Sequence, residues 1–209
     1  MRMLYTSMRP AAVALMALSV ATGASAQSSI SSSVDTSSTP SRIASATSIR
    51  IDNFARVNDT YFRGAQPVGR DYDDLAALGV KTIINLTSDE DVIFDEKDSV
   101  ERSGMRYVHI PMSTRRAPTE KELTAFLTVV SDAASQPVYV HCVGGRHRTG
   151  VMTAVYRMTR DGLSGDQAFK EMKQFKYGPD FLHPEFKKFV YDYRVPKTAA
   201  VVTSGSQQQ

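Results

Sequence analysis

The ten residues from His141 to Gly150, HCVGGRHRTG, contain the only cysteine of the 209-residue chain. Gly144 and Gly145 allow backbone conformations in which several N–H groups curl around one anion. Arg148 can hold two phosphate oxygens at once through its planar guanidinium group. The same positive field lowers the pKa of a thiol, and the thiolate is the nucleophilic form. The segment therefore predicts a phosphate-binding loop with Cys142 as its nucleophile.

The predicted order of elements around this loop supports that interpretation. The apolar stretch Pro137–Cys142, PVYVHC, predicts a buried strand that ends at the cysteine, and a helix is expected to begin near Arg148. Ligands of α/β sheets bind beyond the carboxyl ends of the strands. A helix that starts there offers unpaired N–H groups and partial positive charge to an anion.

Cys142 also has other interpretations. Free cysteine is among the most often buried residue types, so one alternative is a passive core residue. Sulfur-transfer enzymes also place a cysteine in an anion-binding loop, but the five-residue spacing to Arg148, followed by Thr149, favours phosphate. A nucleotide-binding P-loop is excluded because the Gly-Lys-Ser/Thr ending is absent. A zinc site is not indicated, since there is no second cysteine and His141 is directly adjacent.

The spacing of Cys142, Arg148 and Thr149 closely resembles the signature of the cysteine-dependent protein tyrosine phosphatase superfamily. The upstream stretches YFRGAQP, LAALGVKTIINLT and YVHIPM resemble its compact dual-specificity branch. The histidine inside GRHRTG resembles the atypical plant-and-fungal type, which includes inositol pyrophosphate phosphatases. The resemblance spans roughly residues 57 to 193. It implies an α/β fold, with a mainly parallel central sheet flanked by helices.

The resemblance also implies roles for the residues of the loop. Cys142 would take the phosphoryl group as a phosphocysteine, and Arg148 would stabilise the equatorial oxygens in the transition state. Thr149 would hydrogen-bond the sulfur and make it a better leaving group, and His141 would orient the loop and lower the thiol pKa. No metal or other cofactor is expected. The expected phosphate-binding loop consists of six residues: Val143, Gly144, Gly145, Arg146, His147 and Arg148.

The general acid is missing from its usual place. The superfamily usually supplies an Asp from the loop after the strand that precedes the cysteine strand, but here that loop, Pro111–Thr119, contains no carboxylate. Three carboxylates follow the predicted strand Lys81–Thr87, at the same sheet edge as Cys142: Asp89, Glu90 and Asp91. We favour Asp89 as the acid, although charge at a helix start would also explain all three. Glu120 and Glu122 have the same structural alternative.

Three arginines are candidates for binding the substrate. Arg115 and Arg116 lie where the acid loop should be, and would favour a substrate with extra negative charge; a solvated turn explains them equally well. Arg63 either contacts the substrate or braces a loop. A missing acid is compatible with a pyrophosphate substrate, because a phosphate leaving group has a second pKa of about 6, against about 10 for tyrosine.

Alternating strand and helix patterns around the loop predict an α/β domain. Strands are predicted over Asp59–Pro67, Lys81–Thr87, Arg106–Met112 and Pro137–Cys142. Helices are predicted over Asp71–Gly79, from a Ser88/Asp91 capping box to about Ser103, from a Thr119/Glu122 capping box, over Thr149–Gly162, from a Ser164/Gln167 capping box, and from Pro184.

The ends of the chain differ in composition from this domain. Residues 1–26 have a basic start, a 13-residue apolar run and a small-residue end, which predicts a secretory signal cleaved after Ala26. Residues 27–48 are rich in Ser and Thr and predict a flexible lead-in, residues 49–195 the domain, and residues 196–209 a disordered tail. The run is shorter than the roughly 20 residues of a membrane span, so no stable membrane insertion is expected after cleavage.

The sequence thus predicts an exported phosphatase, periplasmic or secreted, that hydrolyses phosphomonoesters of the phosphotyrosine or dual-specificity type. The expected substrate is a phosphorylated protein or a small phosphorylated molecule. An inositol polyphosphate or pyrophosphate phosphatase and an inactive phosphate-binding module are the alternatives. The formal charge is +3, and about +1 without Arg2 and Arg9, so nucleic acid is not an expected partner.

Overall fold

The computed structural model describes residues 49–91 and 95–196, which form an α/β domain. Its sheet has the strand order β1-β2-β5-β3-β4. The strands are β1 (Ala55–Asn58), β2 (Tyr61–Ala65), β3 (Thr82–Asn85), β4 (Arg106–His109) and β5 (Val138–Cys142). The helices are α1 (Asp71–Ala77), α2 (Lys97–Arg102), α3 (Glu120–Ser131), α4 (Arg148–Arg160), α5 (Gly165–Gln174) and α6 (Pro184–Asp192), with a short 3-10 helix at Asp89–Asp91.

The sheet is parallel except for β1, which pairs antiparallel with β2. β5 lies between β2 and β3, with Ala65 opposite Cys142 and Asn85 opposite His141. All five residues of β5 are buried, as expected for a central parallel strand covered on both faces. The carboxyl ends of β2, β3 and β5 therefore meet at one sheet edge, where Cys142 lies.

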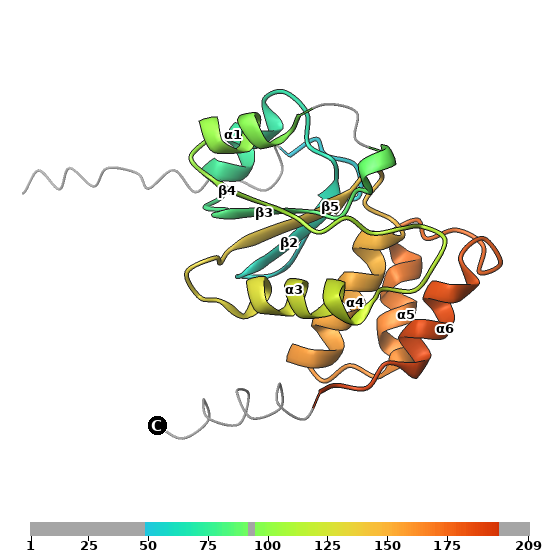
Figure 1. The fold of residues 1–209 in the computed structure, drawn as a ribbon. Helices are drawn as coiled ribbons and strands as arrows, with labels where there is room; N and C mark the ends of the chain where they lie inside the picture. Colours follow the sequence, from blue (N-terminus) through green and yellow to red (C-terminus); the bar gives the residue numbers. More distant parts are fainter. Residues whose placement is uncertain (1–48, 92–94, 197–209) are drawn as a thin grey trace, which may run out of the picture. The chain divides into compact units, whose positions relative to one another are not determined.

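Helices cover both faces of the sheet (Figure 1). On one face, Tyr61, Ile84 and Val140 pack against apolar residues of α3, α4, α5 and α6. On the other face, Phe62 and Tyr139 pack against α1 and α2. The alternation along β2 and β5 follows the period of two of a strand. Two apolar clusters thus hold β5 rigidly from both sides.

The predicted mainly parallel α/β fold is confirmed. The capping boxes at Thr119 and Ser164 are both formed, and Pro184 is the first residue of α6. The helix predicted from Ser88 to about Ser103 is wrong, because this stretch contains a 3-10 turn and the separate helix α2. The Ser88 hydroxyl donates to the Asp91 carboxylate at 2.7 Å, and the Asp91 N–H donates to the Ser88 carbonyl oxygen at 2.9 Å and not to the hydroxyl.

Strand β1 was not predicted. Its four residues, ARVN, are half-buried or exposed and show no clear apolar alternation. The predicted signal segment (1–26), the lead-in (27–48) and residues 197–209 of the predicted tail lie outside the described residues. Among the helices that are described, none combines the length and apolarity needed to cross a membrane.

Candidate active site

The loop after Cys142 is packed tightly against the end of β2. Gly145 has φ +63°, a conformation that favours glycine. A Cβ atom at this position would lie only 2.3 Å from the carbonyl carbon of Gly64. Gly144 is not restricted in this way, since the nearest atom to its added Cβ would be 3.5 Å away. Of the two glycines, Gly145 is thus the one that allows the loop to pack closely against β2.

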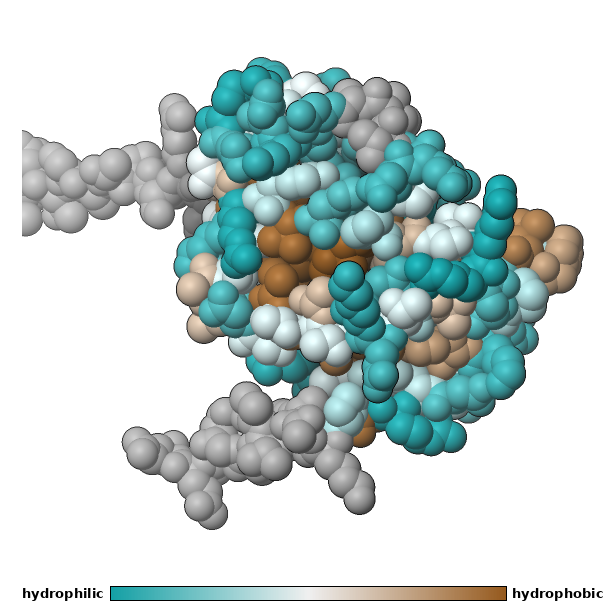
Figure 2. All heavy atoms as spheres, in the orientation of Figure 1, coloured by the Kyte–Doolittle hydropathy of each residue, from teal (hydrophilic) through white to brown (hydrophobic). Residues whose placement is uncertain are grey.

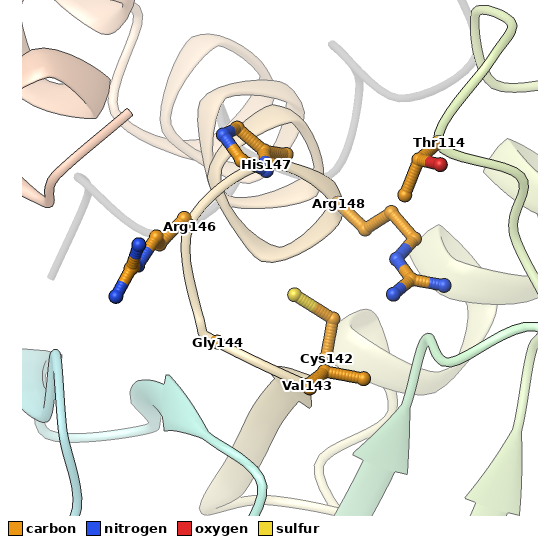
Figure 3. Close-up of a pocket in the computed structure, with 7 residues that line it drawn as sticks. All are labelled: Thr114, Cys142, Val143, Gly144, Arg146, His147 and Arg148. Carbon is orange, nitrogen blue, oxygen red and sulfur yellow. The ribbon is translucent and has the colours of Figure 1, made fainter. Parts of the chain in front are cut away.

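The loop encloses an open pocket of about 340 Å³. Figure 3 shows the sulfur of Cys142 inside the arc of the loop, with the Arg148 guanidinium to one side and Arg146 extending away. The pocket is lined by Thr114, Cys142, Val143, Gly144, Arg146, His147 and Arg148. Five of the six residues predicted for the phosphate-binding loop therefore surround one pocket together with Cys142. The sixth, Gly145, is buried behind them.

Several donors converge on the sulfur of Cys142. Burial of the thiol opposes ionisation, but the Thr149 hydroxyl, the Arg148 charge and the backbone N–H groups of Thr149 and Arg146 outweigh it. Together they lower the pKa of the Cys142 thiol below its ordinary value. Among the described residues, the Thr149 hydroxyl is buried and has no other hydrogen-bond partner, and it is one of the groups that favour the thiolate. This environment suits a nucleophilic thiolate better than a passive core cysteine.

His141 lies against a carboxylate that the sequence analysis did not single out. Its Nε2 atom lies 3.1 Å from Oε1 of Glu96, and both side chains are almost fully buried. Glu96 also accepts hydrogen bonds from Tyr72 at 3.1 Å and from Asn85 at 2.8 Å. Tyr72 on α1 and Asn85 on β3 thus hold Glu96 beside His141, the residue that precedes the cysteine.

Arg148 is oriented by two acceptors. Its Nη1 atom donates to Oδ2 of Asp91 at 2.8 Å and to the carbonyl oxygen of Met112 at 3.2 Å. Its Nε is buried without a partner in the described residues, and so remains a donor for a phosphate oxygen. Hydrogen bonds from Ser88 and Arg148 lower the pKa of Asp91.

The three carboxylates predicted as acid candidates line a second hollow of about 430 Å³, together with residues 111–116. Asp91 is the one that contacts Arg148. Asp89 is largely exposed, and its carboxylate lies 3.9 Å from Nδ1 of His109. Asp91 therefore lies closest to Arg148, the arginine predicted to bind phosphate, although Asp89 was the favoured residue from the sequence.

The three arginines predicted to bind substrate lie in different environments. Arg116 forms a bidentate ion pair with Glu122, with N···O distances of 2.9 and 2.7 Å, at the start of α3. Arg115 is exposed and lines the second hollow. Arg63 is fully buried and does not line the pocket, so its assignment to substrate binding is corrected. It donates from Nη2 to the carbonyl oxygen of Gly145 at 2.6 Å, behind the loop.

Residues from distant parts of the chain complete the surroundings of the loop. Asn53 donates to the carbonyl oxygen of Gly144 at 2.8 Å, and no sequence pattern had indicated it. The centroid of the His183 ring lies 4.0 Å from that of the His147 ring. The Nδ1 atom of His183 lies 3.1 Å from the carbonyl oxygen of Thr114, in the segment that follows β4. The connection from α5 to α6, called the rim below, therefore reaches the pocket through His183, which contacts the lining residues His147 and Thr114.

That rim is apolar. Phe181 is 77% exposed and Leu182 is 54% exposed. Figure 2 shows an apolar patch on the side of the molecule where Figure 1 draws the connection between α5 and α6. Val143, a lining residue, is also exposed. The pocket therefore combines a cationic floor with apolar surface nearby.

Comparison with known proteins identifies the chain's relatives. The family model described as "DSP-PTPase phosphatase fused to NAD+ Kinase" matches residues 41–186. The dual specificity protein phosphatase TpbA of Pseudomonas aeruginosa is 27% identical over 128 residues, covering 61% of this chain and 56% of TpbA. The inositol diphosphatase DSP2 of Oryza sativa is 30% identical over 116 residues, covering 50% of this chain and 53% of DSP2. The chain thus spans about half the length of these curated relatives.

Solved structures share the fold. The core catalytic domain of the PP-IP phosphatase SIW14 from S. cerevisiae matches with a TM-score of 0.61 and 22% identity, over 74% of this chain and 92% of that one. P. aeruginosa TpbA in complex with pTyr matches with a TM-score of 0.60 and 22% identity, over 74% and 91%. At this level of identity, the likeness concerns the arrangement of the elements.

Proposed function

We propose that this chain, which belongs to the DSP-PTPase phosphatase family, hydrolyses phosphomonoesters through a phosphocysteine intermediate. One observation carries the proposal. A thiol with a lowered pKa lies in the arc of a glycine loop, where Arg148 and backbone N–H groups converge. An anion-binding loop around a thiolate is the arrangement that nucleophilic attack on a phosphate requires.

The reaction has two steps. The Cys142 thiolate attacks phosphorus, an S–P bond forms, and the P–O bond to the leaving group breaks. Water then attacks the phosphocysteine, the S–P bond breaks, and phosphate and the thiolate are released. Arg148 and the loop N–H groups stabilise the charge on the phosphoryl oxygens, and the Thr149 hydroxyl stabilises the departing sulfur.

A proton must reach a poor leaving group such as a phenolate. Asp91 is the carboxylate that contacts Arg148 and thus lies nearest to the phosphate oxygens that this arginine would hold. We assign it the role of general acid in preference to Asp89, which faces His109 and solvent.

Phosphotyrosine-type substrates are the first candidates. The apolar rim formed by Phe181 and Leu182 offers contact area to a peptide or an aryl ring. TpbA, a relative with the same fold, has been solved in complex with pTyr.

An inositol pyrophosphate is the second candidate, and a different observation favours it. The segment 111–119 supplies no carboxylate, and the lowered pKa of Asp91 makes it a weak proton donor at neutral pH. A phosphate leaving group departs without much protonation. DSP2 and SIW14, named for inositol diphosphate and PP-IP chemistry, are among the matched proteins.

One panel of assays separates these functions. The parent and the Cys142→Ser variant are incubated with an aryl phosphate, a phosphotyrosine peptide, inositol phosphates with and without a diphosphate, and thiosulfate. We expect phosphate release by the parent alone, fastest on the preferred class. Absence of phosphate release from pH 4 to 8, a range that brackets lowered thiol pKa values, would indicate an inactive binding module. Turnover of thiosulfate would indicate sulfur transfer.

Export is a further part of the proposal and rests on residues 1–26 alone. Their basic start and short apolar run support cleavage after Ala26 and a periplasmic or secreted product. Expression of the full chain, and of a chain that begins at Gln27, in a bacterial host tests it. The full chain should leave the cytosol with a new N-terminus at Gln27. Retention of an intact N-terminus in the cytosol would contradict export.

A further inference from the structure

Arg63 is a buried cation directly behind the loop that follows Cys142. Its side chain is fully buried in the middle of β2, and its guanidinium stacks on the Phe175 ring at 4.0 Å from the centroid. Nη2 donates to the Gly145 carbonyl oxygen at 2.6 Å, while Nε and Nη1 have no partner in the described part of the chain. Burying a charge is costly unless it is compensated.

The acceptor of Arg63 is one end of the peptide group that faces the sulfur. The carbonyl of Gly145 and the N–H of Arg146 belong to the same planar trans peptide, so they point in opposite directions. The Arg146 N–H is one of the donors that lower the pKa of the Cys142 thiol. Fixing the oxygen from behind therefore aims the N–H at the sulfur.

The other charged or titratable groups around Arg63 do not balance its charge. Tyr61 and Tyr139 stay neutral, since burial raises the pKa of both phenols. Glu171 is already paired with Arg157 at 3.0 Å. Among the described residues, no carboxylate lies within ion-pair distance of Arg63. Cys142 is the remaining neighbouring group that can carry a compensating negative charge, and its charge also favours the Arg63 cation.

We propose that Arg63 is a positioning residue for Cys142: its guanidinium fixes the Gly145–Arg146 peptide from behind, and its buried charge stabilises the thiolate. This role rests on the proposed function, because a stable thiolate is what the phosphatase needs. It explains why a cation is kept in the interior of β2 without an acidic partner among the residues that the structure describes.

Alkylation of the single cysteine tests the role without any turnover. The rate of reaction of Cys142 with iodoacetamide is measured against pH for the parent, Arg63→Gln and Arg63→Lys. We expect the midpoint of the Arg63→Gln profile to rise by about one pH unit, a tenfold loss of thiolate at a given pH. Arg63→Lys keeps the charge but loses the planar stack, so its midpoint should lie between the other two.

A matched control is Arg56→Gln, on the neighbouring strand β1, where the side chain is exposed and its carboxylate partner is Asp59. Its midpoint should equal that of the parent. If Arg63→Gln does not fold, as judged by circular dichroism, Arg63→Lys decides the question. A parent-like midpoint in either folded Arg63 variant overturns the inference. A shifted midpoint in a protein that releases no phosphate would instead overturn the proposed function.

Discussion

At the scale of single residues, Cys142 and Asp91 must start the reaction in opposite protonation states. The sulfur attacks as a thiolate, whereas a carboxyl group can donate only while it is protonated. Interactions in the structure lower the pKa of both groups. As the pH rises, Asp91 loses its proton below the ordinary carboxyl pKa of about 3.9, and the thiolate forms below the ordinary thiol pKa of about 8.5. A reaction that needs both groups therefore slows at a pH above both pKa values, where Asp91 is ionised.

The pH profile should thus depend on the leaving group. For an aryl phosphate with a poor leaving group, we expect kcat to reach a maximum and to fall at a pH above both pKa values, because protonated Asp91 is lost. For an activated aryl phosphate, the fall should be absent. Steady-state assays from about pH 3 to about pH 9, a range that spans the ordinary carboxyl and thiol pKa values, check this. A profile for the poor leaving group that stays level with that of the activated substrate at the highest pH would exclude Asp91 as the acid.

Substitution separates Asp91 from its neighbour. Asp91→Asn should lower kcat for poor leaving groups by about 100-fold, a typical loss for a general acid, and affect activated substrates much less. Asp89→Asn is the matched control, because Asp89 lies on the same turn but faces His109. Equal slopes of log kcat against leaving-group pKa in parent and Asp91→Asn would show that the proton comes from elsewhere.

At the scale of elements, the loop works because β2 and β5 are adjacent. The pairing of Ala65 with Cys142 brings the end of β2 against the loop, where Gly145 approaches the backbone of Gly64. Asn53 and Arg63 hold the outward carbonyls of Gly144 and Gly145. The shape of the anion site is thus set by contacts between segments far apart in the sequence.

The two glycines of the loop should therefore respond differently to the same change. Gly145→Ala forces a non-glycine residue to φ +63° and a close contact with Gly64, each costing about 1–2 kcal/mol or more. Gly144→Ala meets only ordinary contacts. We expect Gly145→Ala to lose most phosphatase activity and to unfold at lower urea concentration. Similar activity and urea midpoints for both variants would contradict the close packing of Gly145 against Gly64.

The start of α3 offers a stability test with a defined pH dependence. Glu122 closes the capping box with Thr119 and pairs with Arg116, and these contacts outweigh its burial and lower its pKa. The stabilisation is present above the unfolded carboxyl pKa of about 4.3 and is lost as the pH falls through the lower folded value. Glu122→Gln should cost about 1 kcal/mol at pH 7.

That cost should be much smaller at pH 3, below the unfolded pKa of about 4.3. Urea unfolding at both pH values measures it, with Glu120→Gln, an exposed neighbour on the same helix turn, as the control. A loss of stability that is equal at the two pH values would mean that packing, and not charge, explains the effect of Glu122.

Elements and site differ in how far the sequence predicts them. The strand before Cys142, both formed capping boxes and Pro184 carry local signals, and they were predicted correctly. The residues that support the loop carry no such local signal, although bracing a loop was one of the two interpretations given for Arg63. Glu96 reaches His141, and Arg63 reaches Gly145, only after the strands have paired, across 45 and 82 residues of sequence. Local spacing identifies the loop, whereas its supports are tertiary contacts.

At the scale of the whole molecule, the pocket lies where the loop after β5 approaches the connection between α5 and α6. The loop after β5 supplies the floor, while the connection between α5 and α6 supplies the rim through His183. Phe181 and Leu182 immediately precede His183 on this connection and are exposed. The rim could therefore contact the group that carries the phosphate.

Substitutions on this rim should change substrate preference and leave the chemistry intact. Phe181→Ala combined with Leu182→Ala should lower kcat/KM for a phosphotyrosine peptide by about tenfold, about 1.4 kcal/mol of lost apolar contact. Activity on a small aryl phosphate should stay within a factor of about two, since interactions remote from the reacting bond affect only substrates that reach them. Val68→Ala, another exposed apolar position, is the control. Equal losses on both substrates would contradict a recognition role for the rim.

The central claim is that Cys142 carries the phosphoryl group, and trapping the intermediate tests it most directly. The parent is mixed with an aryl phosphate, quenched in acid, digested, and the phosphorylated peptide is identified by mass spectrometry. The account predicts phosphate on the sulfur of Cys142 in the parent, with neither covalent phosphate nor phosphate release in Cys142→Ser. Undiminished phosphate release by Cys142→Ser, or covalent phosphate on another residue, would contradict it.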